Sequence, residues 1–220
     1  MTLTLCLNLW ILVCSFFGSI YGIKNFFRPK KALYLQMITC GVICMMYARL
    51  FNVIYMFTQG ALHEGFHVGL LGLMGSFMFF FSANYGQMDG LVDDRTKAFR
   101  ATRIKALIVP VVLAAIYAIF LLNIDKMSVR LAVGQIALFI LPCSYYNFKH
   151  IIIYDVDLGI IRQLRFYNIL AVAYAFFTVF ELMGEYLGIL PLYIVSCIAL
   201  GIIAAAIVPV MKGGAEKWTI

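Results

Sequence analysis

Seven apolar runs, each close to twenty residues long, constrain this chain more than any other feature of its sequence. A helix of about 20 apolar residues is long enough to cross the hydrocarbon core of a bilayer. The runs cover roughly residues 3–23, 33–58, 62–86, 104–123, 130–148, 165–187 and 189–211. We therefore predict an all-α polytopic membrane protein in which residues 1–220 form a single domain of seven transmembrane helices.

The composition agrees with lipid as the solvent for much of the surface. Apolar residues make up 64% of the chain and charged residues only 12%, whereas a soluble domain carries about 25% charged residues. All six cysteines fall inside apolar runs and none forms a Cys-x-x-Cys pair. We expect reduced thiols that pack between helices rather than a disulfide framework.

The basic residues predict the orientation of the helices. Of the seventeen, Lys126 and Arg130 lie on one side, Arg49 lies inside the second run, and the other fourteen lie on the opposite side. By the positive-inside rule the N-terminus is outside and the C-terminus is in the cytoplasm. This bias explains the net charge of +7 without a nucleic-acid partner. The first run carries its charges after it, so we expect it to be retained as a helix rather than removed as a signal peptide. We expect the protein to lie in the plasma membrane.

Two stretches of the chain are weakly alike. LVCSFFGSIYGIKNFF resembles ILPCSYYNFKHIIIYD, and YARLF aligns with YAFFT, which pairs runs one to three with runs five to seven and leaves run four as a linker. This 3+1+3 layout resembles that of SWEET and PQ-loop carriers and of microbial rhodopsins. The carrier layout implies a substrate site at the interface of two repeats. However, no Pro-Gln pair is present, and the last run has no Lys to hold retinal, which excludes a rhodopsin.

His63-Glu64-Gly65-Phe66-His67 matches H-E-x-x-H, in which a helix turns two imidazoles to one side to bind zinc while the Glu activates water. With residues 62–86 as one helix, the two histidines face away from a stripe of small residues that suits close helix packing. The stripe is Gly65, Gly69, Gly72, Ser76 and Ala83. A third ligand would have to be a carboxylate, with Glu185 the best candidate. Gly65 weakens such a helix by about 1 kcal/mol relative to Ala.

We therefore expect no bound metal and no cofactor. Three interpretations of the motif stay open. The histidines are interfacial rings, they sense pH or contact a ligand because imidazole titrates near pH 6.5, or they belong to a zinc hydrolase.

Arg49 is the most informative polar residue. It lies about 16 residues into the second run, and Glu181 lies about 16 residues into the sixth, which runs in the same direction, so both reach the same depth of roughly 24 Å. An unpaired charge at that depth costs several kcal/mol, so we predict an Arg49–Glu181 ion pair. Asn52 and Glu185, one turn beyond each, extend it toward the outer surface. Such a pair marks a substrate or ion path, or it only fixes helix register.

A second polar group is predicted at the cytoplasmic side. Asn84, Tyr85 and Asp89 end the third run and would form an inner gate or a docking surface, unless Asp89 simply pairs with a loop Arg. The 87–105 loop is a candidate contact for a protein partner. Asp93 and Asp94 are placed to cap the fourth helix, and Arg95, Arg100 and Arg103 would face lipid phosphates.

Three functional classes follow from these residues. The first choice is a small-solute carrier or permease in the lipid bilayer, with a small molecule or ion at an intramembrane charged site. The second is a membrane sensor or accessory subunit that acts through a partner protein. The third is an intramembrane metallohydrolase. Because the enzyme depends almost wholly on HEGFH, we lean against it.

Overall fold

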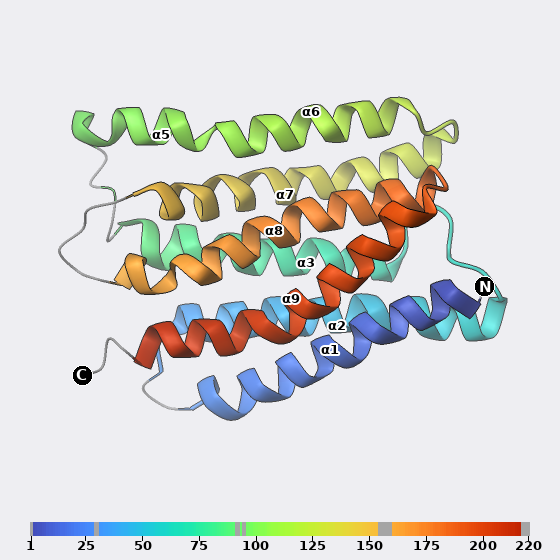
Figure 1. The fold of residues 1–220 in the computed structure, drawn as a ribbon, viewed down its shortest axis with the longest axis horizontal. Coiled ribbons are helices and arrows are strands. Elements are labelled where there is room, and N and C mark those ends of the chain that lie inside the picture. The colour runs from blue at the N-terminus through green and yellow to red at the C-terminus, as the bar shows by residue number, and fades with distance from the viewer. Residues whose placement is uncertain (1, 29–30, 91–92, 94–95, 154–159, 217–220) are drawn as a thin grey trace.

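The computed structural model describes residues 2–28, 31–90, 93, 96–153 and 160–216, and every element in these ranges is a helix (Figure 1). The α-helices are α1 (Thr2–Phe26), α2 (Leu33–Gln59), α3 (Val68–Ser82), α5 (Arg100–Ala106), α6 (Ile108–Leu122), α7 (Met127–Ile152), α8 (Ile160–Tyr186) and α9 (Leu190–Glu216). A π-helix, η1 (Ala83–Asp89), continues α3, and a 3₁₀ turn, η2 (Lys97–Phe99), precedes α5. Seven helical segments are long and apolar enough to cross a membrane. The predicted all-helical, seven-span membrane protein is confirmed at this level.

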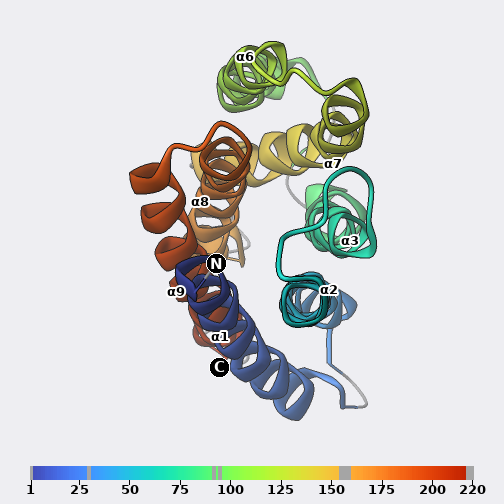
Figure 2. The ribbon, with the colours of Figure 1, turned by 90° about the vertical axis from the view of Figure 1, so that its right-hand side faces the viewer.

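Six of the seven spans form a closed ring. Around the ring, α1 packs on α2, α2 on α3, α3 on α7, α7 on α8, α8 on α9, and α9 again on α1; Figure 2 shows this order end-on. The remaining span, α6, packs against α7 from outside the ring. This is the place that the 3+1+3 prediction assigns to a linker, while the internal repeat itself stays a prediction.

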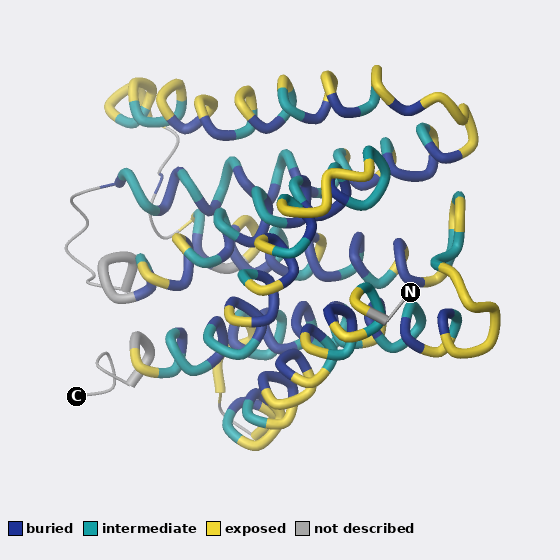
Figure 3. Tube along the Cα trace, turned by 45° about the vertical axis from the view of Figure 1, so that its right-hand side comes forward, coloured by how far each residue is buried: buried dark blue, intermediate teal, exposed yellow. Residues whose placement is uncertain are grey.

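Each ring helix buries one stripe of residues spaced three and four apart, which is the spacing of one helix face. The stripes run through Asn8, Ile11 and Ser15 on α1; Ile38, Val42, Met45 and Arg49 on α2; Leu70, Leu73, Phe77 and Phe80 on α3; Ile136, Ile140, Cys143, Asn147 and His150 on α7; Tyr167, Tyr174, Thr178 and Glu181 on α8; and Tyr193, Cys197, Leu200 and Ala204 on α9. The outer faces expose large apolar side chains such as Phe57 and Leu138 (Figure 3). A helix bundle with an apolar outer surface and a partly polar interior suits a lipid environment.

Small residues let the ring helices approach closely. A Cβ added to Gly72 would lie 2.9 Å from the backbone N of Ala48 and from the backbone O of Cys44, so α3 rests directly on the backbone of α2. Gly184 brings α8 still closer to α9, since a Cβ there would lie 2.5 Å from the backbone N of Tyr193. These contacts are the small-residue packing expected of membrane helices.

The third span begins later than predicted. Residues 61–67 are not helical, and α3 starts at Val68 with His67 as its N-cap. Gly65 has φ +83°, a left-handed conformation that glycine adopts at little cost and that interrupts a helix. The prediction that HEGFH lies on a helix starting near residue 62 is therefore wrong, and Gly65 is the physical reason.

The fourth span starts earlier than predicted and bends. It runs from Lys97 to Leu122 and breaks between α5 and α6 at Leu107. Pro110 lacks an N–H and its ring crowds the carbonyl four residues earlier, which belongs to Ala106, the last residue of α5. Helix α1 begins and helix α9 ends at opposite ends of the bundle (Figure 1). We call the end with residues 60–67 the loop-60 end and the other the η1 end; which of them faces the cytoplasm stays a prediction.

Candidate functional site

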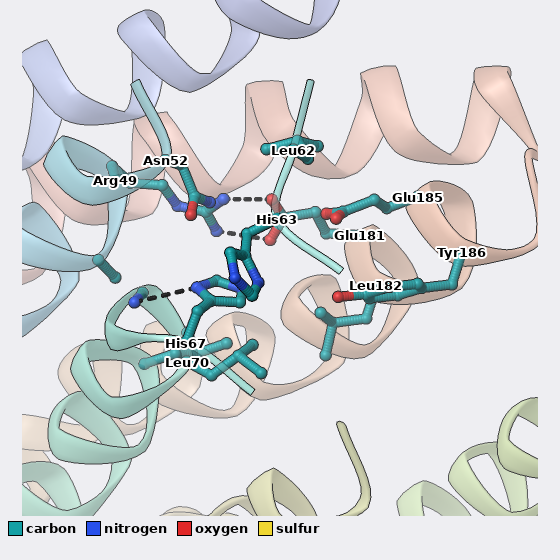
Figure 4. A pocket seen from close by; sticks show the side chains of 13 residues that line it. Arg49, Asn52, Leu62, His63, His67, Leu70, Glu181, Leu182, Glu185 and Tyr186 are labelled. Atoms are coloured by element: carbon teal, nitrogen blue, oxygen red, sulfur yellow. Dashed lines mark hydrogen bonds and ion pairs between the residues drawn. The ribbon is translucent and has the colours of Figure 1, made fainter. Parts of the chain in front are cut away.

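The six residues predicted as a ligand or ion pathway line one cavity at the loop-60 end (Figure 4). Arg49 and Asn52 come from α2, Glu181 and Glu185 from α8, and His63 and His67 from the loop before α3. Leu70, Leu73, Leu182 and Tyr186 complete most of the wall. The free space inside is about 20 Å³, which is enough for a water molecule or an ion of similar size. The structure thus brings these six residues together, while their functional role stays a prediction.

Arg49 and Glu181 form the charged floor of this cavity. Both terminal guanidinium nitrogens of Arg49 donate to the carboxylate of Glu181, one to each oxygen. The Arg49 side chain is 6% exposed and that of Glu181 is 2% exposed. A planar guanidinium facing a carboxylate in this way forms a strong, directional pair. The ion pair predicted from matched depth is confirmed.

Asn8 on α1 joins this pair to two further helices and was missed from the sequence. Its Oδ1 accepts from Arg49 Nη1 at 3.3 Å and from Asn52 Nδ2 at 3.4 Å. Its Nδ2 donates to the Tyr193 hydroxyl at 3.1 Å. The Cys197 thiol, also on α9, lies 3.9 Å from Glu181 Oε1. The signal was available, because Asn8 is an amide inside an apolar span, where an uncompensated polar group is costly.

Glu185 differs from Glu181 in forming no ion pair with Arg49. It lies one turn further along α8 and lines the same cavity. Glu181 is occupied by Arg49, whereas Glu185 makes no hydrogen bond or ion pair with any residue that the structure describes. The cavity therefore contains one carboxyl group that no side chain in the described part of the chain bonds.

His63 and His67 lie side by side without a helix to present them. Their ring centroids are 5.2 Å apart, His67 stacks on Phe51, and His63 packs edge-on against Tyr55. His67 Nδ1 accepts the backbone N–H of Gly69 at 3.1 Å, which requires that this nitrogen carry no proton. Burial, helped by the neighbouring His63, lowers the pKa of His67 to about 4. His67 is therefore a neutral cap of α3 at physiological pH.

The Glu of HEGFH does not join the histidines. Glu64 is exposed and pairs with Lys126, which immediately precedes α7. Among the described residues, no group of three or more His, Cys, Asp or Glu side chains is arranged to hold a metal ion. The H-E-x-x-H interpretation needed two imidazoles and a carboxylate presented by one helix, and this arrangement is not formed.

At the η1 end, two of the three predicted residues enter one buried network. Asn84 Nδ2 donates to Asn147 Oδ1 at 2.6 Å, and Asn84 Oδ1 lies 3.2 Å from His150 Nδ1. Asp89 bonds Lys149 Nζ at 2.6 Å and lies 3.3 Å from His150 Nε2. Burial by itself raises the pKa of Asp89, but the hydrogen bonds and charges of His150 and Lys149 outweigh it and hold the pKa below its usual range.

Two expectations for this end are corrected. Asp89 pairs with Lys149 of α7, not with a loop Arg. The N-cap residue of the fourth span is Thr96 and not the predicted Asp93. Asp93 bonds Lys149 and Arg103, so Arg103 faces a carboxylate as well as the surface. Tyr85 is exposed and stacks on Phe81, and its part in an inner gate or a docking surface stays a prediction. Asp94 and Arg95 lie outside the described residues.

No protein-family model, curated protein or solved structure matches this chain. The role of the site therefore has to be argued from its own geometry.

Proposed function

We propose that this integral membrane protein is a carrier for a small solute and that the cavity at the loop-60 end is its binding site. The observation that carries the proposal is the Glu185 carboxyl group, which makes no hydrogen bond or ion pair with a described residue and lies beside the buried Arg49–Glu181 pair in a cavity inside a ring of six spans. Charged side chains inside a membrane are costly, and they most often mark the path of a substrate, ion or proton. A pair that served only to fix helix register would not need a second carboxylate one turn away.

The size and charge of the cavity favour a small cation, hydronium included. Its wall carries one guanidinium and two carboxylates, and His67 adds no charge because it caps α3 in its neutral form. The free space of about 20 Å³ suits an ion or a water molecule and leaves no room for a sugar or an amino acid. A cation at Glu185 would balance the remaining negative charge.

The contacts of Arg49 support a way for the pair to rearrange. Asn8 Oδ1 already accepts from Arg49 Nη1, so the guanidinium keeps an acceptor when Glu181 turns toward a cation. Asn52 donates to the same Asn8 oxygen and lines the cavity. In this scheme the cation enters from the loop-60 end, engages Glu185, and then competes with Arg49 for Glu181. We further propose that this end faces outward and that the plasma membrane holds the protein.

Cation flux into proteoliposomes tests the proposal. Vesicles loaded with a pH-sensitive or sodium-sensitive dye should show flux with the unmodified protein. Glu185→Gln should lower the flux to that of empty vesicles, because a neutral amide does not balance a cation. The matched control is Glu64→Gln, which removes an exposed carboxylate outside the cavity lining and should leave flux unchanged. Equal flux in both variants would refute the assignment of Glu185, and cation binding without flux would favour the sensor or accessory-subunit alternative.

A further inference from the structure

A layer of buried aromatic side chains lies between the cavity and the η1 end. Phe77 and Phe80 of α3 and Tyr167 and Tyr174 of α8 are all fully buried. Phe77 stacks on Tyr174 at 4.7 Å between centroids, and Phe80 meets Tyr174 and Tyr167 edge-on at 5.7 and 6.4 Å. Tyr174 donates to Ser76, because the Ser76 hydroxyl gives its own proton to the Leu73 carbonyl. None of these four rings lines the cavity, and their contacts fill the space between α3 and α8 on its η1 side.

Gly41 on α2 makes room for the layer. A Cβ at this position would lie 2.5 Å from Cε1 of Phe80, closer than side chains approach one another in packed proteins. The ring of Phe80 therefore crosses from α3 toward the α2 backbone. Just beyond Phe80 the chain changes from α-helix to the π-helix η1.

Beyond the aromatic layer, η1 is fastened to α7 by oriented hydrogen bonds. Asn147 Nδ2 donates to the backbone O of Cys143 at 2.7 Å. This contact turns Asn147 Oδ1 toward the Asn84 amide, which donates to it. The orientation of both amides is thus fixed by a backbone carbonyl, since a flipped Asn147 would place two oxygens against each other.

Lys149 is the residue that holds this junction together. It is 2% exposed and bonds Asp89 and Asp93, both at 2.6 Å. Without the Lys149 ammonium, His150 would be the remaining ion-pair partner of Asp89 among the described residues. Two buried carboxylates would then lie beside each other with one cation fewer, which is costly in a buried site. One side chain of α7 therefore binds both Asp89, at the end of η1, and Asp93.

The π-helix is the unusual element of this junction. π-Helical turns are rare, are usually single turns, and occur often at functional sites. Seven residues, Ala83–Asp89, have this conformation here. Return of η1 to α-helical hydrogen bonding would change the direction of Asn84 and Asp89 relative to α7. The network with Lys149 then has to be broken.

We propose that η1 is a gate that Lys149 holds shut. The gate opens the η1 end of the ring when Lys149 leaves Asp89 and Asp93. As a gate of a transport path it rests on the proposed carrier function, but its opening is measurable without any solute.

Cys143 is a native reporter for this gate. It is fully buried on α7 and lies 3.2 Å from Asn147 Nδ2. In purified full-length protein with the other five cysteines replaced by Ala, we would measure the rate at which a small charged methanethiosulfonate modifies Cys143. Lys149→Met should raise this rate about tenfold or more, because local opening exposes the thiol. Lys105→Met, an exposed lysine on α5, is the matched control and should leave the rate unchanged.

Two further measurements separate a gate from a general loss of structure. Lys149→Arg retains the cation and should keep Cys143 protected. Cys197, on the cavity side of the aromatic layer, should stay protected in Lys149→Met when it is the single reporter. No increase at Cys143, or an equal increase at Cys143 and Cys197, would overturn the proposal. Labelling needs no solute, so the two proposals can fail separately. If Glu185→Gln leaves flux unchanged while Lys149→Met exposes Cys143, the carrier proposal is refuted and the gate proposal stands.

Discussion

Arg49 and Glu181 stand 132 positions apart in the chain and share two hydrogen bonds between α2 and α8, almost completely removed from solvent. No other pair at the loop-60 end combines opposite charge, two bonds and burial in the described part of the chain. The cost of breaking it is therefore unequal for the two partners, because a carboxylate can take up a proton and a guanidinium cannot release one.

Glu181→Ala should destabilise the protein more than Arg49→Ala. The first change strands a permanent charge in a buried site, with an expected loss of a few kcal/mol. The second leaves a carboxylate that becomes neutral by protonation. Replacement of both residues, Arg49→Met with Glu181→Leu, should recover most of the loss. Thermal unfolding in detergent measures all three variants, and strictly additive losses would show that the two side chains do not interact.

An exposed pair serves as the control for this series. Glu64 and Lys126 also form an ion pair, but their side chains are 70% and 64% exposed. Glu64→Ala should therefore change stability by less than about 1 kcal/mol.

Stability should fall in mildly acidic solution through His67. Its pKa is lowered to about 4 from an ordinary value of 6.5, by burial and by His63. In the unfolded protein the His67 imidazole takes up a proton below about pH 6.5, whereas in the folded protein it stays neutral. The stability of the fold is therefore lost as the pH falls from about 6.5 toward 4. His67→Asn keeps a side chain that caps helices well and does not titrate. The melting temperatures at pH 7.5 and pH 5 should differ less in this variant, and an unchanged difference would exclude His67 as the cause.

Depth along a helix is what made the charged pair predictable. The rise per residue is constant, so two residues equally far into parallel spans must lie at the same level. The energetic cost of an unpaired charge inside a membrane then favours pairing Arg49 with the carboxylate at its own level. The same reasoning placed Asn52 and Glu185 in the cavity. The ring order of the helices was not predictable, because every span has an apolar outer face and hydropathy alone does not choose its neighbours.

The errors arose where a helix ends. Hydropathy extended the third span to residue 62, although Gly65, with its positive φ, was the visible reason to end it. The fifth span continues to Ile152, beyond the predicted residue 148, and so carries Lys149 and His150 toward η1 on a helix. Periodicity also contains no sign that the end of α3 is π-helical, since the π-turn depends on tertiary contacts with α7.

Gly72→Ala should weaken the packing of α3 on α2. The new methyl group would lie 2.9 Å from two backbone atoms of α2, and backbone cannot move aside as a flexible side chain can, so we expect a loss of about 1–3 kcal/mol. Gly134→Ala on α7 is the matched control, because its nearest neighbour would be a leucine methyl at an ordinary 3.6 Å. That change should be neutral or slightly stabilising, since Ala favours helix. Similar melting temperatures for both variants would contradict the close α2–α3 contact.

The N-terminus should lie outside the cell and the C-terminus inside. The prediction rests on the placement of the basic residues, fourteen of seventeen of which fall on one side. A tag after residue 220 should react with a membrane-impermeant label only after the cells are opened. Labelling in intact cells would reverse the topology and the direction of the proposed path.

Cation flux through the folded Arg49→Met, Glu181→Leu double variant is the most direct test of the central claim. The claim is that the buried pair belongs to the binding site and does more than hold α2 and α8 in register. The double variant should unfold at nearly the temperature of the unmodified protein, which establishes that it is folded, and its flux in proteoliposomes should equal that of empty vesicles. Full flux in the folded double variant would contradict the claim and reduce the Arg49–Glu181 pair to a structural contact.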